Sequence, residues 1–161
     1  MMRWDDFGRA LKTILLELQL RAVLVMLSRE RPSLLVQISG VEAGGNIVVQ
    51  LGYRDDGDDF SQRHVADLER RGFAEQFEHG RLWQRVLPWP TPSAAVAEVV
   101  QASLVRLRDI GGMGSPDGLQ YRAWREPEGA GTSGLQEGLE RGEDCVEFPS
   151  LGTPMQLTET W

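Results

Sequence analysis

The spacing of apolar residues changes twice before residue 53, and this change limits the fold more than any other feature of the chain. Apolar side chains in residues 4–18 recur at three- and four-residue steps, the pattern of an amphipathic helix. Residues 22–27 are apolar throughout, as in a strand covered on both faces. Residues 34–38 and 47–53 alternate, as strands with one buried face do. The sequence therefore predicts a helix over about 6–19, followed by three strands.

The three predicted strands are joined by short polar connections, at residues 29–32 and 40–46. Such connections leave no room for a crossover helix, so the strands are expected to form an antiparallel meander. One face of the second and third strands is uniformly apolar and is expected to meet the core. The other face combines Leu35, Gln37, Val48 and Gln50. This mixture is too apolar for a purely solvated face and too polar for a core, so it suits a docking surface.

A second helix is predicted from Ser61 to Gly72. Ser61 is a good N-cap residue, because its side chain can accept a hydrogen bond from a free backbone amide. Gly72 can adopt the left-handed conformation that ends a helix, and Phe73 can then fold back onto Leu68.

Residues 73–86 are predicted to form a hairpin that turns at His79 and Gly80. Pairing about this turn places two sets of side chains on opposite faces of the hairpin. One set comprises Phe73, Phe77, Leu82 and Val86. The other comprises Ala74, Gln76, Trp83 and Arg85.

A third helix is predicted to begin at Thr91 and Pro92, with Thr91 as its cap, and to end at Gly111 and Gly112. Residues 119–125 then alternate as an additional strand would. Taken together, residues 1–125 are expected to form one α+β domain in the order α-βββ-α-ββ-α. Its twisted antiparallel sheet has about five strands, and the first and third helices pack on one face.

Residues 126–161 differ in composition from the rest of the chain. They hold eight Asp and Glu side chains against Arg141 alone, which accounts for the whole net charge of −7. Glycine is frequent and apolar residues are scattered, so this acidic tail is expected to be flexible or loosely docked. One hypothesis is that the tail covers the mixed face of the sheet. A neutral domain with an acidic tail also argues against nucleic-acid binding, which needs a basic surface.

The sequence offers little for chemistry. Cys145 is the single cysteine, there is no signal-like start, and no apolar run is long enough for a membrane span, so a cytoplasmic protein is expected. Residues 129–134 spell G-x-G-x-x-G, but they lack the flanking strand and helix of a dinucleotide site. The acidic run 55–59 has its glycine in the wrong place for a calcium loop and is expected to be a solvated turn.

Only His64 and His79 could serve as imidazole ligands or bases, and neither has a plausible partner nearby in the sequence. No catalytic, cofactor-binding or metal-binding residue is predicted, and the protein is expected not to be an enzyme.

Three tryptophans are candidate partner-binding residues together with the mixed face. Trp83 and Trp124 are predicted on strand faces opposite the main apolar stripes, and Trp89 lies between two prolines at a corner. Aromatic side chains with a polar atom are favoured at interfaces. The alternative for each is local packing, since large aromatic side chains are usually well buried.

Several short stretches resemble a known family. They are the apolar start at Trp4, Phe7 and Leu11, the strand at 34–38, and Leu68-Glu69-Arg70-Arg71-Gly72-Phe73. Two more are Leu87-Pro88-Trp89-Pro90 and Ser115-Pro116-Asp117-Gly118-Leu119. With the element order, over about residues 4–125, they resemble the TY-Chap group of type III secretion chaperone-like and YbjN-like domains. Where that family usually has Trp after the helix-ending glycine, this chain has Phe73.

The resemblance implies a domain that binds a client or partner protein, often as a homodimer, and it supplies no catalytic residues. The resulting prediction is a non-enzymatic, chaperone-like domain that holds another protein and needs no cofactor, nucleic acid or membrane. Two alternatives stay open at this point: a homodimeric regulatory or scaffolding domain whose mixed face is its dimer interface, and a small enzyme of unknown chemistry.

Overall fold

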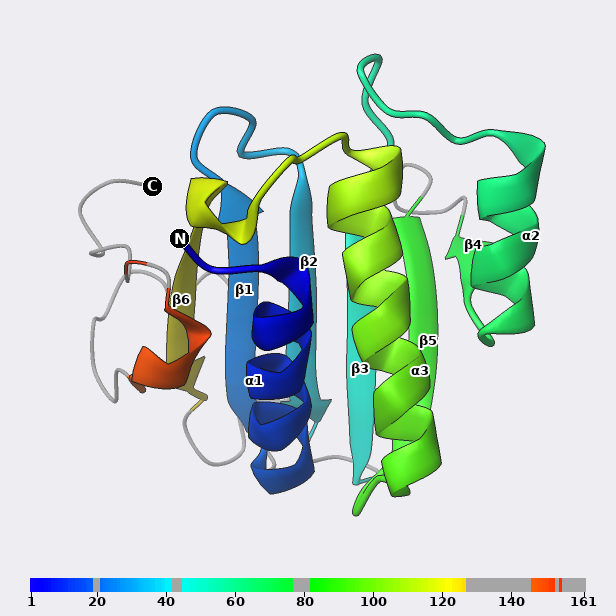
Figure 1. The fold of residues 1–161 in the computed structure, drawn as a ribbon. Helices are drawn as coiled ribbons and strands as arrows, with labels where there is room; N and C mark the ends of the chain where they lie inside the picture. The colour runs from blue at the N-terminus through cyan, green and yellow to red at the C-terminus, as the bar shows by residue number, and fades with distance from the viewer. Residues whose placement is uncertain (19–20, 42–44, 77–81, 127–145, 153, 155–161) are drawn as a thin grey trace.

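Six strands form one antiparallel sheet in the order β4-β5-β3-β2-β1-β6 (Figure 1). The structure is a computed structural model and describes residues 1–18, 21–41, 45–76, 82–126, 146–152 and 154. The strands are β1 (Ala22–Ser28), β2 (Leu35–Val41), β3 (Asn46–Tyr53), β4 (Ala74–Gln76), β5 (Leu82–Pro88) and β6 (Leu119–Arg125). The α+β class, the antiparallel pairing and the element order are confirmed. The strand count of about five was too low, because the alternating stretch 119–125 pairs with β1 as a sixth strand.

Two helices cover one face of the sheet, as predicted. They are α1 (Trp4–Glu17) and α3 (Ser93–Leu104), which continues as the π-helical turn η1 (Val105–Ile110). The two pack against each other, and α2 (Gln62–Arg70) lies apart from them, beside β4 (Figure 1). The close approach of α1 to α3 depends on Gly8, because a Cβ there would lie 3.3 Å from Cδ1 of Leu104. Two short 3₁₀ turns, η2 (Pro116–Gly118) and η3 (Pro149–Leu151), complete the described elements.

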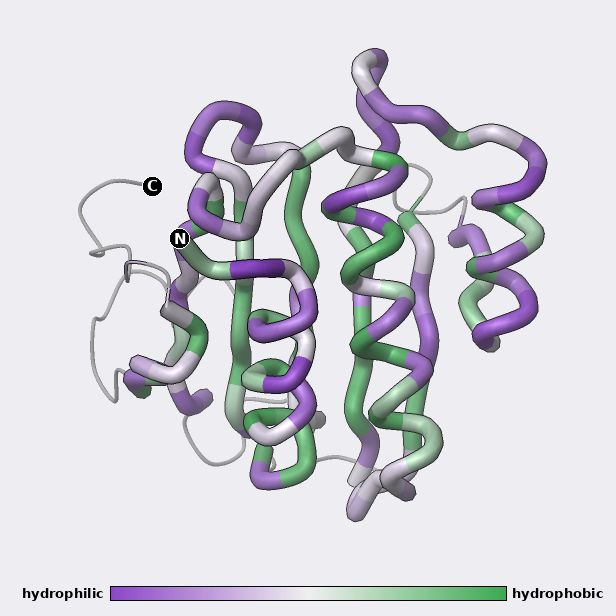
Figure 2. Tube along the Cα trace, in the orientation of Figure 1, coloured by the Kyte–Doolittle hydropathy of each residue, from purple (hydrophilic) through white to green (hydrophobic). Residues whose placement is uncertain are grey.

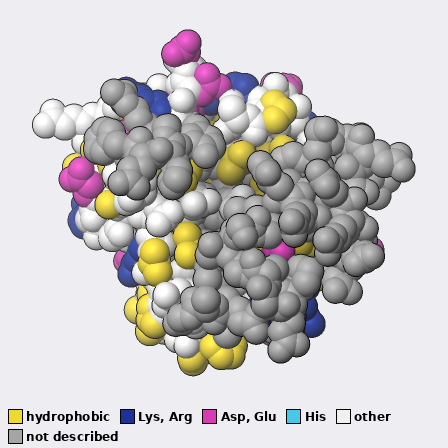
Figure 3. All heavy atoms as spheres, turned by 180° about the vertical axis from the view of Figure 1, so that it is seen from behind, with side chains coloured by type: hydrophobic (Ala, Val, Ile, Leu, Met, Phe, Trp, Pro, Cys, Tyr) yellow, Lys and Arg dark blue, Asp and Glu magenta, His cyan; other side chains and the backbone are white. Residues whose placement is uncertain are grey.

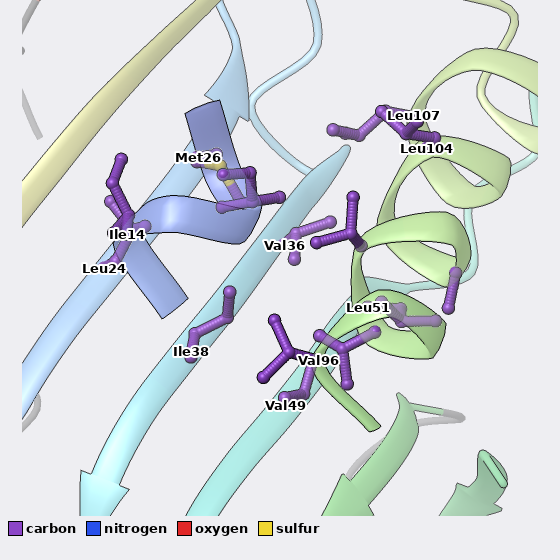
Figure 4. Close-up of a cluster of buried hydrophobic side chains, with 14 of the residues drawn as sticks. Ile14, Leu24, Met26, Val36, Ile38, Val49, Leu51, Val96, Leu104 and Leu107 are labelled. Atoms are coloured by element: carbon purple, nitrogen blue, oxygen red, sulfur yellow. The ribbon is translucent and has the colours of Figure 1, made fainter. Parts of the chain in front are cut away.

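The main core lies between this helix pair and the sheet. The uniformly apolar strand β1 is mostly green along the tube, whereas α1 alternates between green and purple (Figure 2). Ile14 of α1 lies over Leu24 and Met26 of β1, and Val96 of α3 lies beside Val49 of β3 (Figure 4). The apolar stripe read from the sequence is therefore the stripe that α1 buries.

The predicted ends of α2 and the predicted stop of the third helix at Gly111 are confirmed, whereas the predicted N-terminal cap of α3 is wrong. Gly72 has a φ of +85°, and the Phe73 amide donates to the Leu68 carbonyl at 3.0 Å, as the predicted helix end requires. Ser61 stands at the N-cap of α2, but its side chain makes no capping bond. Thr91 does not cap α3, because its hydroxyl donates to the Pro88 carbonyl at 2.7 Å and the helix begins at Ser93.

A buried ion pair ties α3 to the loop between β3 and α2. The Arg106 side chain is fully buried. Its Nη2 donates to Oδ2 of Asp58 at 2.8 Å, its Nη1 to Oδ1 at 3.2 Å, and its Nε to the Leu51 carbonyl at 2.7 Å. Arg31 also pairs with Asp58. The expectation of a solvated turn at 55–59 was therefore wrong for Asp58, whose side chain is completely buried.

Burial and the ion pair act on the pKa of Arg106 in opposite directions. Burial lowers the pKa of Arg106, because the charged form loses its hydration, and the carboxylate of Asp58 acts in the opposite direction. Phe60 adds a third contact, with the Arg106 guanidinium 5.1 Å from its ring centroid.

Removing one partner of this pair should be costly. We expect Arg106→Ala to lower the free energy of unfolding by about 3–5 kcal/mol, because Asp58 would lose its main buried partner. The matched control is Arg108→Ala, in the next turn, whose pair with Asp109 is about one-third exposed and should contribute about 1 kcal/mol or less. Urea unfolding of both variants measures the difference. Equal losses in the free energy of unfolding would show that the buried pair stabilises the fold no more than the exposed pair does.

Candidate functional site

The face of the sheet opposite α1 and α3 carries the mixed side chains that the sequence singles out. Successive side chains of a strand point to opposite faces, so the register between strands decides which residues share this face. Gln37 of β2 lies opposite Gln50 of β3, and Gln50 lies opposite Gln84 of β5. In the next row, Ser39 pairs with Val48, which pairs with Val86. We call the surface formed by the following seven residues the open face: Leu35, Gln37, Ser39, Val48, Gln50, Gln84 and Val86.

A ladder of amides runs across the centre of the open face. The Gln37 side-chain nitrogen donates to the Gln50 side-chain oxygen at 3.2 Å, and the Gln50 nitrogen donates to the Gln84 oxygen at 3.0 Å. Gln37 also donates to the Ser39 hydroxyl at 3.4 Å. Within the described residues, the ladder therefore ends in a free amide N–H pair at Gln84 and a free carbonyl oxygen at Gln37. The ladder satisfies most of its own polar groups and leaves one donor end and one acceptor end for a ligand.

Apolar side chains flank this ladder on both sides. Val48 and Leu35 are half-buried, and Val86 is 52% exposed, which makes it one of the most exposed large apolar residues among those described. The view from behind shows hydrophobic side chains on this side of the molecule (Figure 3). Of the predicted site residues, the structure thus brings Leu35, Gln37, Val48 and Gln50 together.

Trp83 does not belong to this surface, and its predicted position was wrong. It is 3% exposed and lies in the main core, on the helix-covered face. The predicted hairpin pairs Gln76 with Trp83, whereas the structure pairs Gln76 with Leu82. This slip of one residue moves every side chain of β5 to the other face. It also places Gln84 and Val86 on the open face, where the sequence analysis missed them.

Leu87 is the sequence signal that would have favoured the observed register. The predicted hairpin stops at Val86 and ignores Leu87, which is buried and pairs with Ile47 of the core face. If the alternation is extended to this residue, Trp83 and Leu87 fall on the same face of the strand, and Val86 falls on the opposite face. The tip of the hairpin, with His79 and Gly80, lies outside the described residues.

Trp124 is on the predicted face but is buried. It belongs to a second apolar cluster with Val23, Val25 and Leu27, on the β1 and β6 part of the sheet, and Leu35 packs against this cluster. Its indole N–H donates to the Glu126 carboxylate at 2.9 Å. As the structure stands, Trp124 is therefore a packing residue and not an exposed contact.

Trp89 lies at an exposed corner, as expected, with 43% of its surface accessible. Its indole N–H donates to the Leu18 carbonyl at 3.0 Å, and its backbone amide donates to the Gly45 carbonyl at 3.0 Å. These bonds fix the side chain at the end of the sheet where β3 begins. It can meet a partner there only at the margin of the open face.

A cavity of about 420 Å³ opens at the other end of β5, between α2 and β4. Its apolar walls include Phe60, Phe73 and Trp83, and the rings of Phe60 and Trp83 stack with their centroids 6.5 Å apart. Glu69 and Glu75 stand at the same cavity. Trp83 thus faces this cavity on the core side.

The described residues contain no group of three His, Cys, Asp or Glu side chains that could hold a metal ion. The glycine-rich motif at 129–134, Cys145 and His79 lie outside the described residues, so the predicted absence of a catalytic, cofactor or metal site stays a prediction. In the parts of the chain that are described, no helix is both long and apolar enough to cross a membrane. What the open face can do is bind another chain through van der Waals contact and hydrogen bonds.

Comparison with protein families gives one match. The model of TY-Chap3, described as "T3SS (YopN, CesT) and YbjN peptide-binding chaperone 3", matches residues 2–125. This match includes the whole stretch, about residues 4–125, on which the resemblance was based. Comparisons with the curated proteins and with the solved structures give no match.

Trp83 and Val86 distinguish the two registers by experiment. We expect Trp83→Ala to lower the free energy of unfolding by about 3–5 kcal/mol, as a large core truncation does. Val86→Ala should change it by only about 0.5 kcal/mol, because the side chain is half exposed. Urea unfolding of the two single variants measures both, and a larger loss for Val86→Ala would favour the register predicted from the sequence.

Proposed function

The chain belongs to the TY-Chap3 family of peptide-binding chaperones, and on this premise we propose that it holds an extended or partly folded segment of another protein on its open face. The single observation that carries the proposal is the composition of this face. Three hydrogen-bonded amides cross it between apolar side chains, and none of its seven members carries a charge. Uncharged surfaces of this kind, apolar with few polar groups, are typical of the centres of protein interfaces.

The amide ladder suits an extended client. A peptide backbone offers N–H and C=O groups at regular spacing, and the ladder offers a free donor end at Gln84 and a free acceptor end at Gln37. Val48, Val86 and Leu35 then supply contact area for client side chains of any apolar type. Binding of this kind is tolerant of sequence, because the amides address the backbone and not the side chains.

The proposed contact set differs in part from the sequence prediction. It keeps Leu35, Gln37, Val48 and Gln50, and it places Trp89 at the margin. It adds Ser39, Gln84 and Val86 and leaves out Trp83 and Trp124, which are buried. This function needs no reaction, cofactor, metal, nucleic acid or membrane. We also propose that the protein is cytoplasmic, because it has a single cysteine.

A homodimer is the second candidate for the same surface. The ladder has a donor end and an acceptor end, so two copies related by a twofold axis can pair the donor end of one with the acceptor end of the other. The exposure of Val86 on this face favours the same arrangement, because dimerisation would bury it. In that case the protein is a regulatory or scaffolding domain, and the open face is its own interface.

A charged residue introduced on the open face should impair client binding without preventing the protein from folding. We expect Val48→Asp and Val86→Asp to abolish suppression of aggregation of a heat-unfolded model protein, measured by light scattering, while thermal unfolding of the variant changes by only a few degrees. Leu16→Asp is the matched control, because Leu16 is 51% exposed on α1, on the other side of the sheet. Its activity should equal that of the unmodified protein.

The same variants distinguish the two candidates. Size-exclusion chromatography with light scattering gives the oligomeric state of each variant. Loss of a dimer with unchanged suppression of aggregation would favour the homodimeric domain. Unchanged suppression in both Asp variants, with no change of mass, would exclude the open face from either role.

A further inference from the structure

A short segment from beyond the family-matched region is docked on the outer edge of β6. The Val146 amide donates to the Ala123 carbonyl at 3.0 Å, and the Tyr121 amide donates to the Pro154 carbonyl at 3.1 Å. Because β6 is the last strand of the sheet, both bonds use backbone groups that an edge strand otherwise leaves open. Between these two bonds the segment leaves the strand and forms the turn η3, which contacts α1 and lies beside β6 (Figure 1).

Three apolar side chains of this segment point into the domain. Leu151 is completely buried and belongs to the main core, and Val146 and Phe148 pack against that core. The Phe148 amide donates to the Tyr121 hydroxyl at 2.8 Å, and the two rings lie 6.3 Å apart. This part of the tail is therefore packed more closely than the loosely docked tail that the sequence predicts. Residues 127–145 and 155–161, with the rest of the predicted cover, lie outside the described residues.

The close fit extends to the N-terminus of the domain. Gly152 has a φ of +66°, and a Cβ at this position would lie 2.3 Å from Cε of Met2. A side chain at residue 152 would be strained by the left-handed backbone conformation, and the end of the Met2 side chain would have to move to admit it. We call the surface formed by Tyr121, Ala123 and Met2 the β6 edge site.

The contacts at this site have the form of a bound peptide. Two backbone hydrogen bonds hold the ends of the segment, and side chains at its first, third and sixth positions supply the apolar contact. Peptide-recognition domains commonly combine backbone bonds at a sheet edge with pockets for particular side chains. The segment is also separated in sequence from β6 by residues 127–145, and it lies outside the residues 2–125 that match the family.

We propose that the docked segment, residues 146–152 with Pro154, is an intramolecular ligand of the β6 edge site. The client that displaces this ligand is a segment with the same apolar spacing, Val-x-Phe-Pro-x-Leu. The proposal rests on the peptide-binding premise of the proposed function, but it concerns a different surface. A tethered segment competes at an effective concentration of about 1 mM, so a free client must match its contacts to replace it. The site is therefore closed by the chain itself until such a client arrives.

The test uses the full-length chain with Leu151→Ala and a labelled nine-residue peptide with the sequence of residues 146–154, VEFPSLGTP. We expect the peptide to bind this variant at least about tenfold more tightly than the unmodified chain, because the internal competitor has lost its main apolar contact. The peptide should also raise the melting temperature of the variant. Fluorescence anisotropy and thermal unfolding measure the two effects.

Two controls make the result specific. A peptide in which the leucine is replaced by alanine should neither bind nor stabilise the variant. Leu104→Ala, a truncation elsewhere in the main core, should be destabilised without being rescued by the native peptide. If Leu151→Ala is destabilised and the peptide has no effect on it, residues 146–151 are a permanent part of the core and the proposal is wrong.

Hydrogen exchange on the unmodified chain tests whether the docked segment can detach, even if the Leu151→Ala variant does not fold. The amides of Val146, Phe148 and Tyr121 should exchange by local opening, much faster than the amide of Val49 in the centre of the sheet. Exchange of all four at the rate of global unfolding would overturn the proposal. Val86→Asp leaves the β6 edge site intact, so failure at the open face and failure at this site are distinguishable.

Discussion

The ion pair between Arg106 and Asp58 is the contact on which the arrangement of the domain depends. A guanidinium without water needs its hydrogen bonds and its charge satisfied nearby, and Asp58 and the Leu51 carbonyl do this for Arg106. The pair therefore fixes the loop after β3 against the π-helical turn at the end of α3. Phe60, which follows in the same loop, contacts both Arg106 and Trp83. The start of α2, beside the cavity at β4, is held by this polar contact, and its end is held by the pair between Arg71 and Glu98 of α3.

The core between the helices and the sheet also determines where a ligand can bind. Most of the helix-covered face of the sheet is filled by α1, α3 and the core between them, and the cavity between α2 and β4 opens beside this core. The remaining places are the opposite face and the two outer strands. On the opposite face, the β1 and β6 part is buried, and the β2, β3 and β5 part is only partly covered. The open face is thus defined by the packing on β1 and β6 as much as by its own residues.

Local patterns predicted most of the fold, and contacts between distant residues account for the errors. The spacing of Phe7, Leu11 and Ile14 was enough for α1, because a helix stripe is encoded within a few residues. The face of Trp83 depended on one residue of hairpin register, which a two-residue turn signal does not determine when both sets of side chains are partly apolar. Arg106 and Asp58 are 48 positions apart, and no sequence pattern near either residue indicates that the two pair. The family, in contrast, was recognisable from its helix ends and turns, which are local.

The two candidate binding surfaces share a property that a chaperone-like domain needs. An exposed apolar face or a bare strand edge invites uncontrolled association, and proteins usually limit this risk by satisfying or covering the polar groups involved. On the open face, the glutamines hydrogen-bond to one another, so the surface is stable in water and still presents apolar side chains. At the edge of β6, residues 146 and 154 occupy the backbone groups of the strand. Under both proposals the client must replace contacts that the domain already makes, which weakens its binding. On the open face any peptide backbone can meet this requirement, whereas the edge of β6 favours segments that match the docked one. Competition with the domain's own side chains and backbone would then be a physical route to holding a client without an energy source.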